Sequence, residues 1–261
     1  MITRTLSRLL VGSLLLLAVS GYAMAEAPKP AKSGYEFVKE ETRAMQDDEV
    51  ENTGYIAVEQ GRELFNQKPA SGKSCASCHG EKGEKLDVKK LARYPIYDKA
   101  LGGVVRLDDR INICREKQSG ETSLPAYSAE LIALETFVRH LAIGEPVNVQ
   151  TDGEMADVLK KGEELYHIRF GLIDMSCAHC HDNYPGQFIR GQKISQGQGN
   201  GFPAYRLDTG EMANLDLRIK QCLTLMRAEP FAPNAEESKL LGAYIMARSN
   251  GLKIETPAMR Y

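Results

Sequence analysis

Apolar residues follow a helical spacing in two segments of the chain, residues 131–138 and 240–245. Each segment is followed by a glycine, Gly144 or Gly251, of the kind that commonly ends a helix. Strict alternation of apolar and polar residues, which is typical of half-exposed strands, is scarce along the chain. The pattern therefore predicts a mostly α-helical protein.

An internal repeat relates the two halves of the chain. A glycine-led segment that begins at Gly61, and another that begins at Gly162, each precede a Cys-x-x-Cys-His motif. An L-D-x-R-I-x-x-C segment then begins at Leu107 and again at Leu215, 108 residues later. Because units that recur in the same order indicate duplication, the sequence predicts two tandem domains of one fold.

The repeat also gives expected domain boundaries. We expect an N-terminal extension over residues 26–50, a first domain over residues 51–147 and a second over residues 152–261. The chain has no tryptophan and only 7% aromatic residues, so each domain of roughly 100 residues has little material for a core. A large flat cofactor in each domain would fill that space.

Residues 1–25 have the pattern of a secretory signal peptide. Arg4 and Arg8 precede a short apolar run, and the stretch closes with Ala23-Met24-Ala25. The run is shorter than the roughly 20 residues that a membrane helix needs, and no later segment approaches that length. The sequence therefore predicts export to the periplasm and a mature protein without a membrane span.

The charge balance bears on the class of partner. The chain has 33 basic and 35 acidic residues, and no run of basic residues is longer than a pair. Nucleic-acid-binding domains usually concentrate positive charge on one face. We therefore expect no nucleic-acid partner.

The repeated Cys-x-x-Cys-His motif is the attachment site of c-type haem. Two thiols about one helical turn apart can add to the two vinyl groups of a porphyrin, and the next imidazole reaches the iron. The sequence thus predicts two covalently bound haem c groups. The predicted attachment cysteines and proximal ligands are Cys75, Cys78 and His79 for the first haem and Cys177, Cys180 and His181 for the second.

Two other uses of paired cysteines are less consistent with the sequence. A thioredoxin-like redox pair normally lies between a strand and a helix, and no βαβ pattern surrounds either motif. A structural zinc site needs four ligands, but each half of the chain has only three cysteines.

The third cysteine of each half is the expected distal iron ligand. Cys114 and Cys222 occupy equivalent positions in the repeat, whereas the methionines do not recur at equivalent places. A thiolate ligand lowers the reduction potential of haem iron. The alternative is a Cys114–Cys222 disulfide, which would need the two Cα atoms within about 7 Å of each other.

An arginine precedes each distal cysteine by four residues. Arg110 precedes Cys114 and Arg218 precedes Cys222, so each pair shares one face of a helix. A guanidinium there would lower the pKa of the thiol and offer a two-pronged site to an oxyanion. The alternative is that these arginines pair with haem propionates.

These motifs, in this order, resemble the SoxA subunits of the SoxAX cytochromes of the periplasmic sulfur-oxidation (Sox) system. The resemblance covers nearly the whole mature chain. It implies two tandem class I cytochrome c-like domains and a small haem-carrying SoxX partner. It also implies an L-cysteine S-thiosulfotransferase activity, in which thiosulfate is joined to a cysteine of the carrier protein SoxYZ and two electrons pass to a cytochrome c.

The resemblance also implies roles for single residues. Carried over, Cys222 is the axial ligand and the reactive sulfur, present as a persulfide, and Arg218 holds thiosulfate. Because some members lack the first haem, the second domain is the expected catalytic one. We further hypothesise that Arg227 or Arg248 helps to bind the substrate.

Two rival functions remain open at this point. One is a thiosulfate dehydrogenase that forms tetrathionate, although that related family generally has a different distal ligand on its other haem. The other is an electron-transfer dihaem cytochrome without a substrate, which would turn over no carrier protein.

Overall fold

The computed structural model describes residues 30–70 and 72–261. The predicted signal peptide, residues 1–25, lies outside the described residues, as does the beginning of the predicted extension. Within the described ranges, every helix is too short or too polar to cross a membrane.

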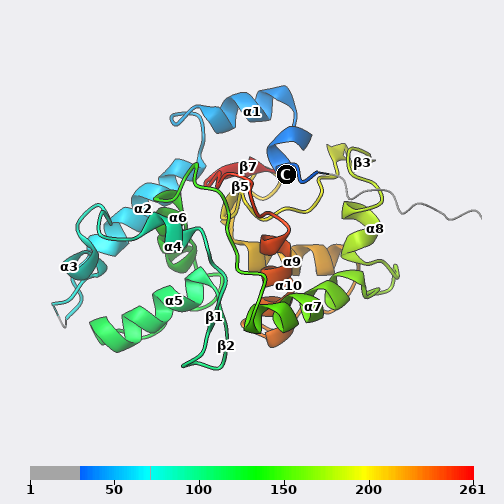
Figure 1. Cartoon of the computed structure of the whole chain (residues 1–261). Helices are drawn as coiled ribbons and strands as arrows, with labels where there is room; N and C mark the ends of the chain where they lie inside the picture. The colour runs from blue at the N-terminus through cyan, green and yellow to red at the C-terminus, as the bar shows by residue number, and fades with distance from the viewer. Residues whose placement is uncertain (1–29, 71) are drawn as a thin grey trace, which may run out of the picture. The chain divides into compact units, whose positions relative to one another are not determined.

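Two helix pairs form the framework of the two repeats (Figure 1). In the first repeat α2 (Gly54–Asn66) packs on α6 (Ala129–His140), and in the second α7 (Glu154–His167) packs on α10 (Glu236–Ala247). The prediction of a mostly α-helical chain with tandem, similar domains is therefore confirmed.

A glycine brings the two helices of each pair into close contact. A Cβ atom on Gly61 would lie 2.0 Å from the carbonyl oxygen of Ala133, and one on Gly162 would lie 2.3 Å from that of Leu240. Cβ atoms do not approach other atoms so closely, so both crossings require glycine. This requirement explains why glycine begins the repeated segment in each half.

An aromatic pair lies beside each helix crossing. Phe65 and Phe137 meet edge to face with ring centroids 5.2 Å apart, and Tyr166 and Tyr244 meet at 5.3 Å. Edge-to-face contact is a favoured arrangement of aromatic rings and adds to their area burial. The two repeats therefore share their packing as well as their motifs.

The glycines expected to end the last helices lie further along the chain. Helix α6 ends at His140 and α10 at Ala247, whereas Gly144 and Gly251 follow four residues later with φ of 81° and 86°. The residue after each helix is still right-handed, so the glycines close the turn that follows the helix.

Each repeat also contains a short antiparallel hairpin that precedes the helix carrying the third cysteine. The sequence pattern did not reveal these hairpins, because strands of three residues are too short to show alternation. In the second repeat, the last strand of the chain, β7, pairs parallel to the first strand of this hairpin, β5. The elements are β1 (Ile96–Asp98), β2 (Gly103–Val105) and α5 (Leu107–Cys114) in the first repeat, and β5 (Ala204–Arg206), β6 (Glu211–Ala213), α9 (Leu215–Leu225) and β7 (Ala258–Arg260) in the second.

Shorter elements complete the described chain. They are the 3-10 turn η1 (Gly34–Phe37), the helices α1 (Glu40–Asp47), α3 (Cys75–His79), α4 (Val88–Leu91) and α8 (Cys177–His181), the π-helical turn η2 (Arg115–Ser119), and the strands β3 (Phe188–Ile189) and β4 (Gln192–Lys193).

The described part of the N-terminal extension packs on the second repeat. Gln46, near the end of α1, accepts hydrogen bonds at its side-chain oxygen from the Met259 amide at 3.0 Å and the Arg260 guanidinium at 2.5 Å. Further towards the N-terminus, Asn200 donates to the Ser33 hydroxyl at 3.1 Å. These contacts join the segment to β7 and to the loop before β5.

A buried polar network joins the two repeats. The Arg106 guanidinium lies 3.0 Å from a carboxylate oxygen of Asp108 and 2.9 Å from one of Asp216. Asn214 donates to the Glu135 carboxyl at 3.0 Å. Because one hydrophobic cluster also contains side chains from both repeats, the boundaries at residues 147 and 152 remain predictions.

Candidate functional site

The two Cys-x-x-Cys-His motifs form single helical turns, α3 and α8. In the first, the Ser74 hydroxyl accepts the Ser77 amide at 3.2 Å, and the Ser77 hydroxyl accepts the Ser74 amide at 3.1 Å. This reciprocal capping box satisfies the free amides at the start of the helix. It holds the two cysteines one turn apart on one face, as attachment to one porphyrin edge requires.

The second motif has the same cap with a histidine in place of Ser77. The Ser176 hydroxyl accepts the His179 amide at 3.3 Å, and the Ser176 amide donates to His179 Nδ1 at 3.2 Å. His179 therefore belongs to the helix cap.

A cavity in the second repeat brings together the predicted residues of the second haem site. It lies between α8 and α9, with further walls from the loop before β5 and from α10. Its lining includes Cys177, Cys180, His181, Arg206, Arg218 and Cys222, with apolar walls from Phe202, Leu223, Leu241 and Ile245.

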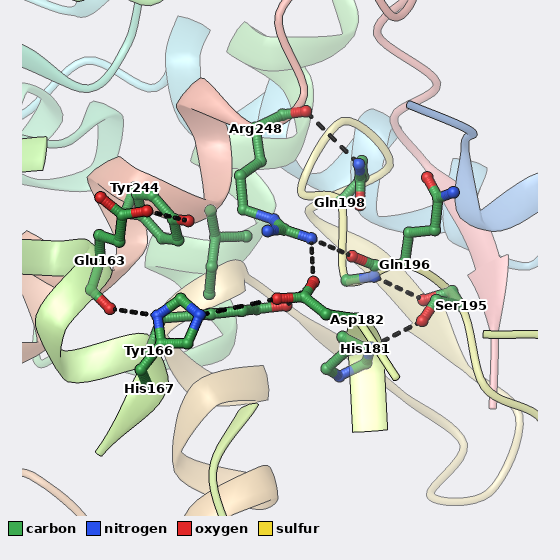
Figure 2. Close-up of polar contacts among 12 residues, drawn as sticks. Glu163, Tyr166, His167, His181, Asp182, Ser195, Gln196, Gln198, Tyr244 and Arg248 are labelled. Atoms are coloured by element: carbon green, nitrogen blue, oxygen red, sulfur yellow. Dashed lines mark hydrogen bonds and ion pairs between the residues drawn. The ribbon is translucent and has the colours of Figure 1, made fainter. Parts of the chain in front are cut away.

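The two predicted axial ligands meet in this cavity. His181 Nδ1 lies 2.8 Å from the carbonyl oxygen of Ser195, which orients the ring (Figure 2). Cys222 lies near enough to His181 for the imidazole to lower the pKa of its thiol. A ligating histidine commonly has such a carbonyl contact at its other ring nitrogen. The two predicted ligands therefore line the same cavity.

Charges around Cys222 favour its thiolate. Burial raises the pKa of the Cys222 thiol, but the Arg218 guanidinium, the contact with His181 and the charge of Arg206 outweigh burial and lower this pKa to about 7. The predicted effect of Arg218 on the thiol is thus present in the structure.

The first repeat also brings its third cysteine close to its motif. The charge of Cys114 raises the pKa of Cys75, and the charge of Cys78 raises that of Cys114, so the three sulfur atoms are near one another. Burial raises the pKa of Cys114, and Arg110 opposes this only in part. The two equivalent thiols therefore differ in their charge environment.

The arginines of the two repeats have different partners. Arg110 forms an ion pair with Asp98 at 2.5 Å and donates to the Tyr94 hydroxyl at 3.3 Å. Arg218 donates a hydrogen bond to the side-chain oxygen of Gln221 at 3.4 Å, and no carboxylate pairs with it among residues 30–70 and 72–261. The positive charge of Arg218 therefore acts on the Cys222 thiol and is not neutralised by a carboxylate of the described chain.

Arg227 and Arg248, which the sequence suggested as further substrate-binding residues, lie in different places. Arg227 lines a shallow surface pocket beside the cavity, together with Arg218. Arg248 forms an ion pair with Asp182 at 2.6 Å and lies over the Tyr166 ring, 4.6 Å from its centroid (Figure 2). Arg248 is thus held by Asp182 and by the cavity-lining Tyr166, and it does not itself line the cavity.

The predicted disulfide alternative is absent. All six cysteines lie within the described residues, and all six are free thiols.

Sequence reasoning missed Arg206, whose side chain lines the cavity with Arg218. The signal was present in the repeat: counted at the same spacing of 108 residues as the L-D-x-R segments, Arg206 corresponds to Asp98. The strands also share a Pro-x-Tyr pattern at this spacing, Pro95-Ile96-Tyr97 and Pro203-Ala204-Tyr205, so the sequence itself relates Arg206 to Asp98.

Comparison with known proteins identifies the family. A family model described as the SoxA/TsdA cytochrome c domain matches the chain twice, over residues 60–147 and 161–254. The chain belongs to the SoxA/TsdA cytochrome c family. Within it, the chain is similar to SoxA subunits over most of its length, as the sequence resemblance predicted.

The SoxA relatives are named as subunits of L-cysteine S-thiosulfotransferase. The one from Pseudaminobacter salicylatoxidans is 37% identical over 87% of this chain and 80% of its own length. That from Rhodovulum sulfidophilum is 34% identical over 91% of this chain and 86% of its own length. A chain in the crystal structure of SoxXA from P. pantotrophus superposes with a TM-score of 0.84, at 32% identity, over 88% of this chain and 87% of that one.

A cytochrome c domain carries covalently bound haem c, and the second-repeat cavity suits this group. The SoxA-type chain places two attachment thiols on one helical turn and apolar side chains around them. Its histidine and its third cysteine line the same cavity. The donor set, one imidazole and one thiol, is one that haem iron accepts.

Proposed function

We propose that the chain is the dihaem subunit of a periplasmic L-cysteine S-thiosulfotransferase. The reaction joins the outer sulfur of thiosulfate to a carrier cysteine, so that one S–S bond forms. A thiol and the thiosulfate dianion give the S-sulfonated disulfide monoanion, one proton and two electrons. A cytochrome c accepts the two electrons.

The unpaired Arg218 is the observation that supports this proposal most strongly. A buried or half-buried guanidinium normally pairs with a carboxylate, as Arg110 does with Asp98. Arg218 lines the cavity beside Cys222 and has no such partner in the described chain. An oxyanion of thiosulfate supplies the missing negative charge, and the guanidinium fork suits its oxygens.

Two haem c groups belong to this proposal. Cys75 and Cys78 would attach the first, with His79 and Cys114 as its axial ligands. The corresponding residues for the second would be Cys177, Cys180, His181 and Cys222. When bound, haem c supplies a one-electron redox centre, and a thiolate ligand gives it a low potential.

The chain's own residues then have distinct tasks. Arg218 orients the thiosulfate dianion beside Cys222, and Cys222, carried as a persulfide, is the sulfur to which the substrate is joined before transfer to the carrier. His181 is held in one orientation by the Ser195 carbonyl. The apolar walls keep water from the reacting sulfur atoms.

The partners and the location complete the proposal. The similar P. pantotrophus chain comes from a SoxXA structure, which supports a SoxX-type haem subunit as partner. The transferase name of the relatives supports a SoxYZ-type carrier and thiosulfate as substrates. The signal-peptide pattern of residues 1–25 supports export to the periplasm.

A carrier-loading assay on matched cysteine variants tests the function. The haem-loaded chain with its SoxX-type partner receives thiosulfate, carrier and oxidised cytochrome c, and the mass of the carrier is followed. We expect Cys222→Ala to abolish loading, because the variant lacks the reacting sulfur. We expect Cys114→Ala, the equivalent change in the first repeat, to retain most of it.

The same assay separates the rival functions. Formation of tetrathionate without modification of the carrier would indicate a thiosulfate dehydrogenase. Reduction of cytochrome c that is independent of thiosulfate and carrier would indicate an electron-transfer cytochrome. Undiminished loading by Cys222→Ala would refute the assigned role of that residue.

A further inference from the structure

The hairpins of the two repeats correspond residue for residue. In the first, Ile96 pairs with Val105 and Asp98 with Gly103, and in the second the pairs are Ala204 with Ala213 and Arg206 with Glu211. Every one of these positions is related to its counterpart by the same 108 residues that relate α5 to α9. Arg206 therefore occupies the position of Asp98, and Phe202 that of Tyr94.

Both polar partners of the first-repeat arginine are replaced in the second repeat. Asp98 and the Tyr94 hydroxyl contact Arg110 at 2.5 and 3.3 Å. Their counterparts, Arg206 and Phe202, offer Arg218 no acceptor. The position that holds a neutralising carboxylate in the first repeat thus holds a second positive charge in the second repeat.

Arg206 is itself incompletely paired. Its side chain is buried, with 2% exposure, and its Nε atom has no hydrogen-bond partner in the described chain. Its one ion-pair partner there, Asp208, lies 3.4 Å away with a side chain that is half exposed. Burial, followed by the charge of Arg218, lowers the pKa of Arg206 to about 10. The charges of Asp208 and Cys222 oppose this shift without cancelling it, so two like charges share one site.

A shallow pocket leads from this pair to the surface. Asp208 is the single acidic side chain in its lining, and the C-terminal residue Tyr261 also lines it. Positive charge in a cleft raises the local concentration of anions. The arginines of this pocket are Arg190, Arg206, Arg218 and Arg227.

We propose that Arg206 and Arg218 together form the binding site of the substrate dianion, and that the replacement of Asp98 by Arg206 confines substrate binding to the second repeat. This inference rests on the proposed function and identifies a second residue of its substrate site. Two guanidinium groups match the charge of a divalent sulfur oxyanion such as thiosulfate, whereas a monoanion would leave one group uncompensated.

Variants of Arg206 in the haem-loaded complex test the inference. We expect Arg206→Gln to raise the KM for thiosulfate roughly 10- to 100-fold, as loss of a charge-assisted contact would, with a smaller change in kcat. Arg206→Lys should give an intermediate KM, because lysine keeps the charge but not the fork. Asp98→Asn, the matched change in the first repeat, should leave KM within about twofold.

Calorimetric binding of thiosulfate, without carrier or electron acceptor, gives a readout that needs no turnover. We expect the wild-type complex and Asp98→Asn to bind with equal affinity, and Arg206→Gln to bind at least tenfold more weakly. Haem content and the absorbance spectrum of each variant are measured alongside. Arg206→Lys serves the same comparison if the glutamine variant does not fold.

The outcomes distinguish this inference from the proposed function. Failure of the wild-type complex to load the carrier, with dianion binding that still depends on Arg206, would refute the function but not the binding pair. Normal loading with unchanged affinity and KM in Arg206→Gln would refute the binding pair alone. If Arg206→Gln loses haem but its haem-loaded fraction binds thiosulfate with unchanged affinity, Arg206 pairs with a haem propionate. This result would also overturn the binding pair.

Discussion

Glu135 is a carboxyl group enclosed between the two repeats. Burial raises its pKa to about 8, and the charge of Asp108 acts in the same direction. The hydrogen bond from Asn214 and the charges of Arg106 and Arg139 oppose this rise without cancelling it. Glu135 is therefore protonated over much of the pH range in which an exposed glutamate is ionised.

The pH dependence of stability follows from that raised pKa. The folded state holds the Glu135 proton more tightly than the unfolded state, where the pKa is near 4.5. The stability that this proton contributes is complete below pH 4.5 and is lost as the pH rises to about 8. Glu135→Gln keeps the shape of the neutral acid but has no proton to lose.

We therefore expect the free energy of unfolding of Glu135→Gln to rise relative to that of the wild type as the pH increases from 4.5 to 8. The slope of the difference is at most about 1.4 kcal/mol per pH unit, the value for one proton. Denaturant unfolding at several pH values measures it. Glu130→Gln, the same change at an exposed position of the same helix, is the control variant. A constant difference between Glu135→Gln and wild type would show that Glu135 is ionised in the folded protein.

Single residues were predicted from the sequence where their chemistry depends on local spacing. The attachment cysteines and the arginine–cysteine pairs are each set by positions three or four apart on a helix, so the sequence shows them directly. Arg206 and Asp98 act through side chains that the fold brings in from a hairpin. Their roles depend on contacts between elements, which no local pattern contains.

At the scale of elements, helix crossings define each repeat. The glycine in each crossing lets one helix lie against the backbone of another. The apolar spacing of the sequence indicated α6 and α10. It did not indicate that the glycine-led segment of each half forms the other helix of the crossing. The hairpins were missed for a related reason, because pairing between three-residue strands leaves little trace in composition.

A glycine substitution tests the crossing in the second repeat. Gly162→Ala would place a Cβ atom 2.3 Å from the Leu240 carbonyl oxygen, so α7 and α10 must separate. We expect a loss of about 1–3 kcal/mol in the free energy of unfolding of the haem-loaded protein. Thermal or denaturant unfolding measures this loss.

Gly242→Ala on α10 is the matched control. A Cβ atom there would meet only Ile219, at an ordinary distance of 3.9 Å, so the backbone need not move. Because alanine favours helix more than glycine does, we expect a change between zero and a gain of about 1 kcal/mol. Equal stability of Gly162→Ala and wild type would contradict the close crossing.

At the scale of the whole molecule, two copies of one arrangement differ in charge at corresponding positions. The first repeat encloses a neutralised arginine, and the second keeps two arginines around its thiol. The repeat in the sequence predicted two similar sites. Because the two halves share the same motifs, the repeat gave no reason to assign the reaction to one site and not to the other. The distinction depends on Asp98 and Arg206, which the structure relates through the hairpins.

The central claim is that Cys222, and not Cys114, receives sulfur from the substrate. The most direct measurement is peptide mass spectrometry after the haem-loaded complex has reacted with thiosulfate labelled in its outer sulfur. Oxidised cytochrome c is supplied as acceptor, and the carrier is left out. We predict labelled sulfur on the Cys222 peptide and none on the Cys114 peptide. Label on Cys114, or an unlabelled Cys222 in a preparation that loads the carrier, would contradict the account.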